Sequence, residues 1–332
     1  MATQFLDDVI QSHQVIQSLD VTDLPAGEHK FWFRIATNAL SQWQHLPVLV
    51  FKGDKPGKKI MITAGVHGDE YNGVLAAQKT ARELIGKELA GTVTVVPTIN
   101  LTGMLNHSRD FYSADPDSSP ANLNRFFPGD ANGNEANRYL FALWNNLLKP
   151  NAELAIDLHT QTSGAAYPLY VFADFRIEQS LEMARSINPD AILNDPGDAG
   201  VLETVWNNSG IPSITIEVGM GRYTEQALID RTVAGIFNVL KRHEVISGEA
   251  SPVIPCLLEG NEIISIRAEF GGFVLPQVKM MDTVEQGQLL AIQYDSFGDE
   301  IQRYMAPTSG TVLSHNIESI RAPGSLVVRL IK

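Results

Sequence analysis

At residues 60–70 the chain reads Ile-Met-Ile-Thr-Ala-Gly-Val-His-Gly-Asp-Glu, and this stretch organises the prediction for the rest of the sequence. Its first half is an apolar, largely β-branched run, typical of a strand that is buried on both faces. The glycines that follow indicate a tight turn, which carries His67 and leads into a helix near Glu70. Turns at the carboxyl ends of strands hold the sites of open α/β folds, so we expect the site here.

His67 and Glu70 stand three residues apart and supply two of the three protein ligands that a catalytic zinc ion takes. His159 directly follows a predicted strand at residues 152–158, and parallel strands end at the same edge of a sheet. It is therefore the candidate third ligand. The alternative is that His67 only serves the turn, Glu70 stabilises a helix N-terminus, and His159 is incidental.

Other polar residues occupy similar positions along the sequence. Asp157 shares a strand face with His159 and is placed to accept the second N–H of a metal-bound imidazole. Glu217 lies near the end of a predicted strand at residues 211–218, where a carboxylate beside a metal acts as a general base. A structural partner for an arginine is the other interpretation of Glu217.

Two arginines lie in a polar stretch at residues 101–133 that lacks helical or strand periodicity. Long irregular stretches inside compact domains are usually functional. The planar guanidinium groups of Arg109 and Arg125 suit a carboxylate or an oxyanion. For either arginine alone, a surface salt bridge is the simpler explanation.

Composition excludes several classes of protein. The 332 residues are 44% hydrophobic, enough for two domains. A net charge of −13 argues against a nucleic-acid partner. The single cysteine, Cys256, permits neither an internal disulfide nor a cysteine-based zinc site. Without a signal-peptide pattern or a membrane-length apolar run, we expect a cytoplasmic protein with no membrane partner.

The order of predicted elements indicates an α/β fold with a mixed, largely parallel sheet. We divide the chain into an N-terminal lead-in at residues 1–27, helical around 5–17, a catalytic domain at 28–247 and an all-β domain at 248–332. The predicted strands are 31–35, 47–51, 59–64, 92–99, 152–158, 169–172 and 211–218, and the predicted helices are 71–89, 135–148, 179–186 and 225–243.

Four motifs together resemble the succinylglutamate desuccinylase/aspartoacylase family, a branch of the zinc carboxypeptidase-like hydrolases. The resemblance covers about residues 45–245, and residues 110–121 look like an insertion relative to shorter members. The motifs are Gly65-Val66-His67-Gly68-Asp69-Glu70, Asn124-Arg125 followed by Phe127-Pro128-Gly129, Asp157-Leu158-His159-Thr160, and Glu217-Val218-Gly219.

The resemblance implies a zinc carboxypeptidase-like α/β/α sandwich and a small C-terminal barrel-sandwich domain similar to biotinyl and lipoyl domains. The hairpin at residues 295–300 of that domain has no lysine, so we expect no biotinyl or lipoyl attachment. The family pattern also implies site roles: His67, Glu70 and His159 as ligands of one zinc ion per chain, Glu217 as general base and proton shuttle, Asn124 and Arg125 as binders of the substrate carboxylate, and Arg109 as the group that polarises the scissile carbonyl.

The implied activity is a zinc-dependent deacylase that removes the acyl group from a small N-acyl amino acid. N-acetylated diamino acids, N-acetylaspartate and N-succinylglutamate are all compatible substrates. Three other functions stay open: a zinc carboxypeptidase acting on peptides, an ester hydrolase, and a non-catalytic ligand-binding module. An appended β-domain is also compatible with a homo-oligomer.

Overall fold

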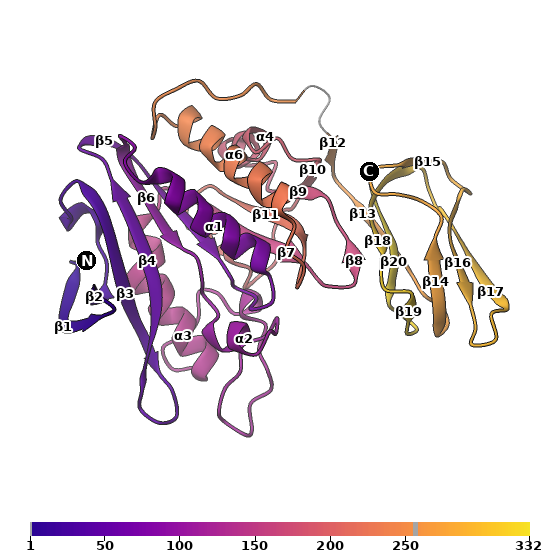
Figure 1. The fold of residues 1–332 in the computed structure, drawn as a ribbon, viewed down its shortest axis with the longest axis horizontal. Helices are drawn as coiled ribbons and strands as arrows, with labels where there is room; N and C mark the ends of the chain where they lie inside the picture. Colours follow the sequence, from indigo (N-terminus) through magenta and orange to yellow (C-terminus); the bar gives the residue numbers. More distant parts are fainter. Residues whose placement is uncertain (1, 255–257) are drawn as a thin grey trace.

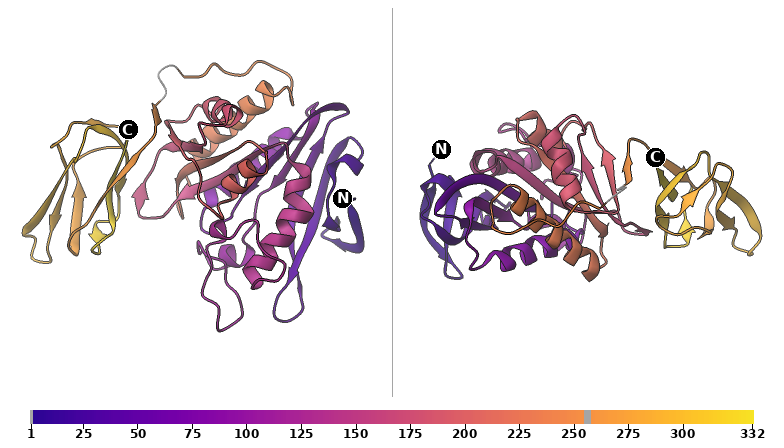
Figure 2. Two further views of the ribbon diagram at one scale, coloured as in Figure 1. Left: turned by 180° about the vertical axis from the view of Figure 1, so that it is seen from behind. Right: turned by 90° about the horizontal axis from the view of Figure 1, so that it is seen from above.

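A computed structural model describes residues 2–254 and 258–332 of the chain. Cys256 lies outside the described residues. A large twisted sheet with helices on both faces forms most of the molecule, and a small β-domain lies at one end (Figure 1). The N-terminal strands lie at the opposite end, as the views in Figure 2 show. The α/β class with a C-terminal all-β domain is therefore confirmed.

The large sheet places parallel strands at its centre. Strands β6, β5, β7 and β11 pair in parallel, and antiparallel strands β4 and β9 flank them. The site residues can therefore gather at one edge. In spatial order the strands are β1 (Gln4–Ile10), β2 (His13–Ser18), β3 (Gly27–Thr37), β4 (Trp43–Lys52), β6 (Ala90–Val96), β5 (Lys55–Ala64), β7 (Leu154–Gln161), β11 (Ser213–Met220), β9 (Leu169–Ala173), β10 (Ala191–Asn194) and β12 (Leu258–Gly260).

Helices cover both faces of this sheet, and each face has its own apolar core. Residues 60–64 are fully buried, as predicted for a strand covered on both sides. One face packs against α1 (Tyr71–Leu84), α4 (Glu178–Ser186) and α6 (Gln226–Arg242), and the other against α3 (Glu135–Leu143), its π-helical continuation Trp144–Leu148 and α5 (Leu202–Asn208). Short helical turns are α2 (Leu101–Leu105), Val21–Asp23, Leu123–Arg125 and Lys149–Asn151.

The predicted N-terminal helix is wrong, because this segment forms the hairpin of β1 and β2. Gln11 and Ser12 connect the two strands, and both have positive φ, of 50° and 65°. Such a two-residue turn matches the twist of a hairpin, but Asn-Gly is its usual sequence signal. Strand β2 then pairs with β3 of the large sheet.

The β-domain consists of two sheets that enclose a small apolar core. One edge reaches back to the large domain, because the short strand β8 (Ala165–Ala166) pairs with β18. The first sheet contains β13 (Ile263–Arg267), β20 (Leu326–Ile331), β18 (Gly310–Asn316) and β15 (Thr283–Val284), and the second contains β17 (Glu300–Met305), β16 (Leu289–Tyr294), β14 (Gly272–Pro276) and β19 (Ile320–Arg321).

The three-part division of the chain stays a prediction. Strand β12, which the sequence assigned to the β-domain, pairs with β10 in the large sheet. Among the described residues, no helix has both the length and the apolar character needed to cross a membrane.

Candidate active site

The turn after β5 adopts a conformation that depends on its glycines. Gly65 has φ +69°, a left-handed conformation that glycine adopts at little cost. A Cβ on Gly68 would lie 2.1 Å from backbone atoms of Gly103 and Met104, so only glycine lets α2 and its following loop approach so closely. The turn thus orients His67 and brings Arg109, on the loop after α2, toward the same place.

Three candidate ligands converge beyond the end of β5. Glu70 is the N-cap residue of α1, and its Oε1 lies 2.8 Å from Nδ1 of His67. Its Oε2 lies 2.9 Å from Nδ1 of His159, which β7 carries. The two Nδ1 atoms are 3.1 Å apart, and all three side chains are almost completely buried. A ligand atom from each lies within 4.8 Å of the others.

The outer nitrogen of each imidazole is held by an oxygen atom. Nε2 of His159 donates to Asp157 at 2.7 Å, and the Thr63 hydroxyl donates to the other oxygen of that carboxylate. Nε2 of His67 lies 2.9 Å from Oδ1 of Asn122, which also accepts from the Asn124 N–H. When both imidazoles are neutral and protonated at Nε2, the two Nδ1 lone pairs are directed at the same point.

This donor set fits a metal ion. Two nitrogen lone pairs and a carboxylate that face one another repel unless a proton or a metal cation lies among them. Zn–N and Zn–O bonds of roughly 2.0–2.2 Å separate tetrahedral donors by about 3.3–3.6 Å, somewhat more than the 2.8, 2.9 and 3.1 Å observed here. The contact between Asp157 and His159 is the one expected behind a metal-bound histidine.

The charges within the cluster favour an ionised Glu70. Burial raises its pKa, but His67 and His159 outweigh burial and hold the pKa well below its ordinary value. Burial lowers the pKa of His159, but the carboxylates of Asp157 and Glu70 outweigh burial and raise this pKa well above its ordinary value. The Thr160 backbone N–H donates to Glu70 at 2.9 Å and fixes its orientation.

Glu217 lies beside this cluster on β11, directly opposite His159 on β7. It is 6% exposed, and its Oε2 has no hydrogen-bond partner among the described residues. Burial, followed by repulsion from Glu70, raises the pKa of Glu217 to about 7. A carboxyl group with that pKa can both accept and return a proton near neutral pH.

Arg109 and Arg125 reach the same cavity although sixteen residues separate them. The segment at residues 110–121 is closed at its base, where Phe111 and Ala121 exchange two backbone hydrogen bonds of 2.8 and 2.9 Å. Nη1 of Arg109 lies 2.7 Å from Oε1 of Glu70. Oδ1 of Asn124 accepts from the Leu202 N–H at 2.8 Å, which anchors the second arginine loop to α5.

A cavity of about 260 Å³ contains all the predicted site residues. It also has lining residues that the sequence reasoning missed, most of them on the segment between β10 and α5 or on β9 and β11. Pro196 and Gly197 are residues typical of a turn, and α5 itself was not predicted. The missed residues include Asp195, Asp198, Glu203, Phe172 and Thr215.

Asp69 stands between His67 and Glu70 in the turn but does not cap the helix that follows, because α1 has no side-chain cap. Instead, the Asp69 carboxylate lies 3.4 Å from Nε of Arg222. The turn thus joins Asp69 to the segment that follows β11.

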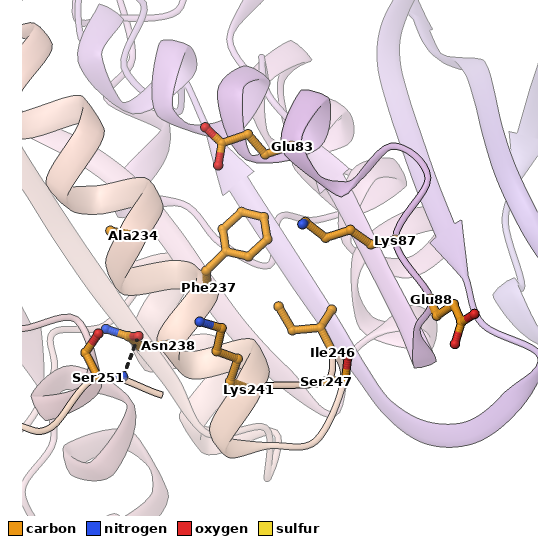
Figure 3. Close-up of a pocket in the computed structure, with 10 residues that line it drawn as sticks. All are labelled: Glu83, Lys87, Glu88, Ala234, Phe237, Asn238, Lys241, Ile246, Ser247 and Ser251. Atoms are coloured by element: carbon orange, nitrogen blue, oxygen red, sulfur yellow. Dashed lines mark hydrogen bonds between the residues drawn. The ribbon is translucent and has the colours of Figure 1, made fainter. Parts of the chain in front are cut away.

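A larger hollow of about 520 Å³ lies between α1, α6 and the segment that follows α6 (Figure 3). The ammonium group of Lys87 lies 5.5 Å from the centre of the Phe237 ring, and Asn238 accepts from the Ser251 backbone N–H. These contacts are structural, and the hollow shares no residue with the site cavity.

Comparisons with known proteins agree with this geometry. The family model of the succinylglutamate desuccinylase/aspartoacylase catalytic domain matches residues 56–243. N-alpha-acetyl-L-2,4-diaminobutyric acid deacetylase from Halomonas elongata is 29% identical over 285 residues, which cover 81% of this chain and 80% of the relative.

Two solved structures share the fold. The product-bound ectoine utilization protein EutE from Ruegeria pomeroyi has a TM-score of 0.81 at 21% identity, covering 93% of this chain and 97% of that one. A succinylglutamate desuccinylase/aspartoacylase from Rhodobacter sphaeroides has a TM-score of 0.80 at 20% identity, covering 93% and 98%.

The fold, the site and these matches define a hydrolase that acts on amide bonds. The chain belongs to the succinylglutamate desuccinylase/aspartoacylase family.

Proposed function

We propose that this protein is a zinc-dependent deacylase that hydrolyses the amide bond of a small N-acyl amino acid. The observation that carries the proposal is the convergence of Nδ1 of His67, Nδ1 of His159 and the Glu70 carboxylate, each with its outer contacts satisfied. These three residues would hold the ion. Zinc supplies Lewis-acid polarisation of a carbonyl and activation of water.

Glu217 is the proposed proton carrier. Glu217 lines the cavity, its Oε2 has no hydrogen-bond partner among the described residues, and its pKa of about 7 lets it take a proton from the attacking water. It then returns this proton to the departing amine, which leaves as the free amino acid. The reaction is then balanced: the water oxygen bonds to the acyl carbon, the C–N bond breaks, and Glu217 carries the proton from the water to the amine nitrogen.

The arginines are the proposed substrate-binding groups. Arg125 lines the cavity and takes part in no ion pair among the described residues, so its guanidinium is available to a substrate carboxylate. The oxygen of Asn124 is used by α5, which leaves its amide nitrogen to donate to the same carboxylate. Arg109 lies beside the ligands and is placed to stabilise charge on the acyl oxygen.

The relative from Halomonas elongata supports an N-acetyl amino acid as the substrate. We therefore favour removal of an acetyl group from the amino nitrogen.

Metal analysis followed by a substrate panel tests the proposal. We expect one zinc per chain and release of free amine from N-acetyl amino acids, lost with a chelator and restored by added zinc. A panel of peptides with free C-termini is the comparison. Release of C-terminal residues from peptides, with none from N-acyl amino acids, would show a carboxypeptidase instead.

A further inference from the structure

Three carboxylates of the site cavity have no part in the proposed reaction. Asp195, Asp198 and Glu203 all line the cavity, the first two on the segment that joins β10 to α5 and Glu203 in the first turn of α5. No ion pair among the described residues involves any of them. The cavity therefore has an acidic wall, as we call these three residues, in addition to its arginines.

Glu203 is the innermost member of the acidic wall. It is 4% exposed, and its carboxyl group accepts a hydrogen bond from the Thr215 hydroxyl. Burial, followed by repulsion from Asp195, raises its pKa well above the ordinary value. A buried carboxylate without a cation is costly, so a positively charged ligand group would complement Glu203.

Asp195 and Asp198 extend the acidic wall toward solvent. Asp195 is half-buried, and burial raises its pKa, with Asp198 adding to the shift. The neighbouring acid Asp174 differs, because Nε and Nη2 of Arg176 hold both of its oxygens. Arg176 thus neutralises Asp174, whereas no carboxylate of the acidic wall is paired with a basic side chain among the described residues.

The acidic wall is fixed relative to the Arg125 loop. The Leu202 N–H donates to Asn124 at 2.8 Å, and the Phe127 N–H donates to the Gly200 carbonyl at 3.1 Å. A Cβ on Gly200 would lie 2.1 Å from the Arg125 carbonyl oxygen, so the two segments are in direct backbone contact. One cavity therefore presents a guanidinium group and a set of carboxylates in a fixed arrangement.

We propose that the acidic wall binds an ammonium group on the amino-acid side chain of the substrate, so that the enzyme selects N-acyl diamino acids. The inference rests on the proposed function, in which Arg125 takes the carboxylate of the same substrate. An anionic side chain finds no positive partner at the acidic wall and opposes the ionisation of its carboxyl groups, which disfavours N-acyl derivatives of aspartate and glutamate.

The test compares side chains of similar shape and different charge. The substrates are Nα-acetyl-L-2,4-diaminobutyrate, Nα-acetyl-L-norvaline, in which a methyl group replaces the ammonium, and N-acetyl-L-glutamate. We expect kcat/KM to be at least about tenfold higher for the cationic substrate than for the neutral one, and lowest for the anionic one.

Two conservative variants, Glu203→Gln and Asp195→Asn, remove charge from the acidic wall without removing volume. We expect each to lower kcat/KM for the cationic substrate, and so to reduce the preference for the cationic over the neutral substrate at least about tenfold. Glu88→Gln is the matched control, because Glu88 is exposed and lies in the hollow of Figure 3, outside the site cavity. Circular dichroism verifies folding.

Calorimetric binding of free L-2,4-diaminobutyrate and L-norvaline adds a readout that does not need turnover. The inference is supported if the diamine binds more tightly than norvaline, and if this difference is lost in Glu203→Gln and kept in Glu88→Gln. This result supports the inference even if no N-acyl amino acid is hydrolysed. Absence of hydrolysis by itself refutes only the proposed function. A result in which the unmodified protein shows equal kcat/KM and equal binding affinity for the cationic and the neutral compounds overturns the inference. So does a Glu203→Gln or Asp195→Asn variant that weakens both equally.

Discussion

At the scale of single residues, the candidate metal ligands depend on their outer hydrogen bonds as much as on their positions. His159 is oriented by a carboxylate and His67 by an amide oxygen, so the two imidazoles present the same nitrogen through different partners. Neither Asp157 nor Asn122 needs to touch a metal to determine where the lone pairs point.

The first prediction concerns His67. His67→Ala removes one of three ligands from a preformed site, so zinc content should fall from one per chain to nearly none while the sheet stays folded. Elemental analysis and far-ultraviolet circular dichroism measure the two effects. His13→Ala, at the N-terminal hairpin, is the control and should keep its metal. Full zinc occupancy in His67→Ala would contradict the assignment.

Glu217 yields a prediction about turnover. Glu217→Gln keeps the shape of the side chain but cannot carry a proton, so kcat should fall by roughly 10²–10⁴, the range typical of general acid–base catalysis. Steady-state kinetics on protein with verified zinc content provide the measurement. Turnover equal to that of the unmodified enzyme would exclude Glu217 as the proton carrier.

The raised pKa of Glu217 also predicts how stability depends on pH. In metal-free protein the pKa is about 7 when folded, against 4.5 for an unperturbed glutamate. Between these values the folded state binds more protons, so unfolding free energy falls as pH rises through this window. Relative to Glu217→Gln, the unmodified protein should lose about 2–3 kcal/mol between pH 5 and pH 8. Urea unfolding of both proteins at pH 5 and pH 8 measures this loss. The prediction would be refuted if the difference in unfolding free energy between the two proteins were the same at both pH values.

At the scale of elements, the site depends on how closely α1 crosses β7. A Cβ on Gly73 would lie 2.6 Å from the Leu158 carbonyl oxygen and 3.3 Å from the His159 backbone nitrogen. The absence of a side chain at Gly73 lets the start of α1, which carries Glu70, approach the strand that carries His159.

Gly73→Ala tests this close approach by the sign of its effect. Alanine favours a helix over glycine by about 1 kcal/mol, but the clash with β7 should reverse this and destabilise the protein by roughly 1–3 kcal/mol. Urea unfolding measures the change. Gly271→Ala is the control, because its Cβ would meet nothing nearer than 3.8 Å. A stabilised Gly73→Ala would show that α1 moves away without cost.

At the scale of the whole molecule, the β-domain touches a loop of the catalytic cavity. Strand β8 pairs with β18, and Gly164, just before β8, accepts hydrogen bonds from the backbone N–H groups of Ile317 and Glu318. The Arg321 guanidinium also donates to Gly164. Thr162, on the same loop, lines the cavity.

We expect Arg321→Ala to loosen this loop and to raise KM about threefold to tenfold, with a smaller effect on kcat. A hydrogen bond from a charged group contributes roughly 1.5–3 kcal/mol, part of which holds the loop in place. Steady-state kinetics test this. Arg303→Ala, which breaks only the exposed pair with Glu300 on β17, is the control. Equal kinetics for Arg321→Ala and Arg303→Ala would show that the β-domain does not act on the cavity.

Much of the fold followed from local patterns. The buried run at 60–64, the helix from Tyr71 and the strand that carries His159 were readable because side-chain periodicity is a property of neighbouring residues. The N-terminal hairpin was missed, because Gln11 and Ser12 carry no turn signal. The predicted helix there rested on local pattern alone, and local pattern does not show which segments pair as strands.

The sequence by itself determined which residue types lie at the ends of the strands, and therefore the candidate ligands His67, Glu70 and His159. Only the tertiary structure decided which other residues share their cavity. Strand order places β11 between β7 and β9, and the segment after β10 packs against the Arg125 loop. These contacts join residues far apart in the chain, and local propensity does not encode them, so Asn122 and the acidic wall emerged only from the folded molecule.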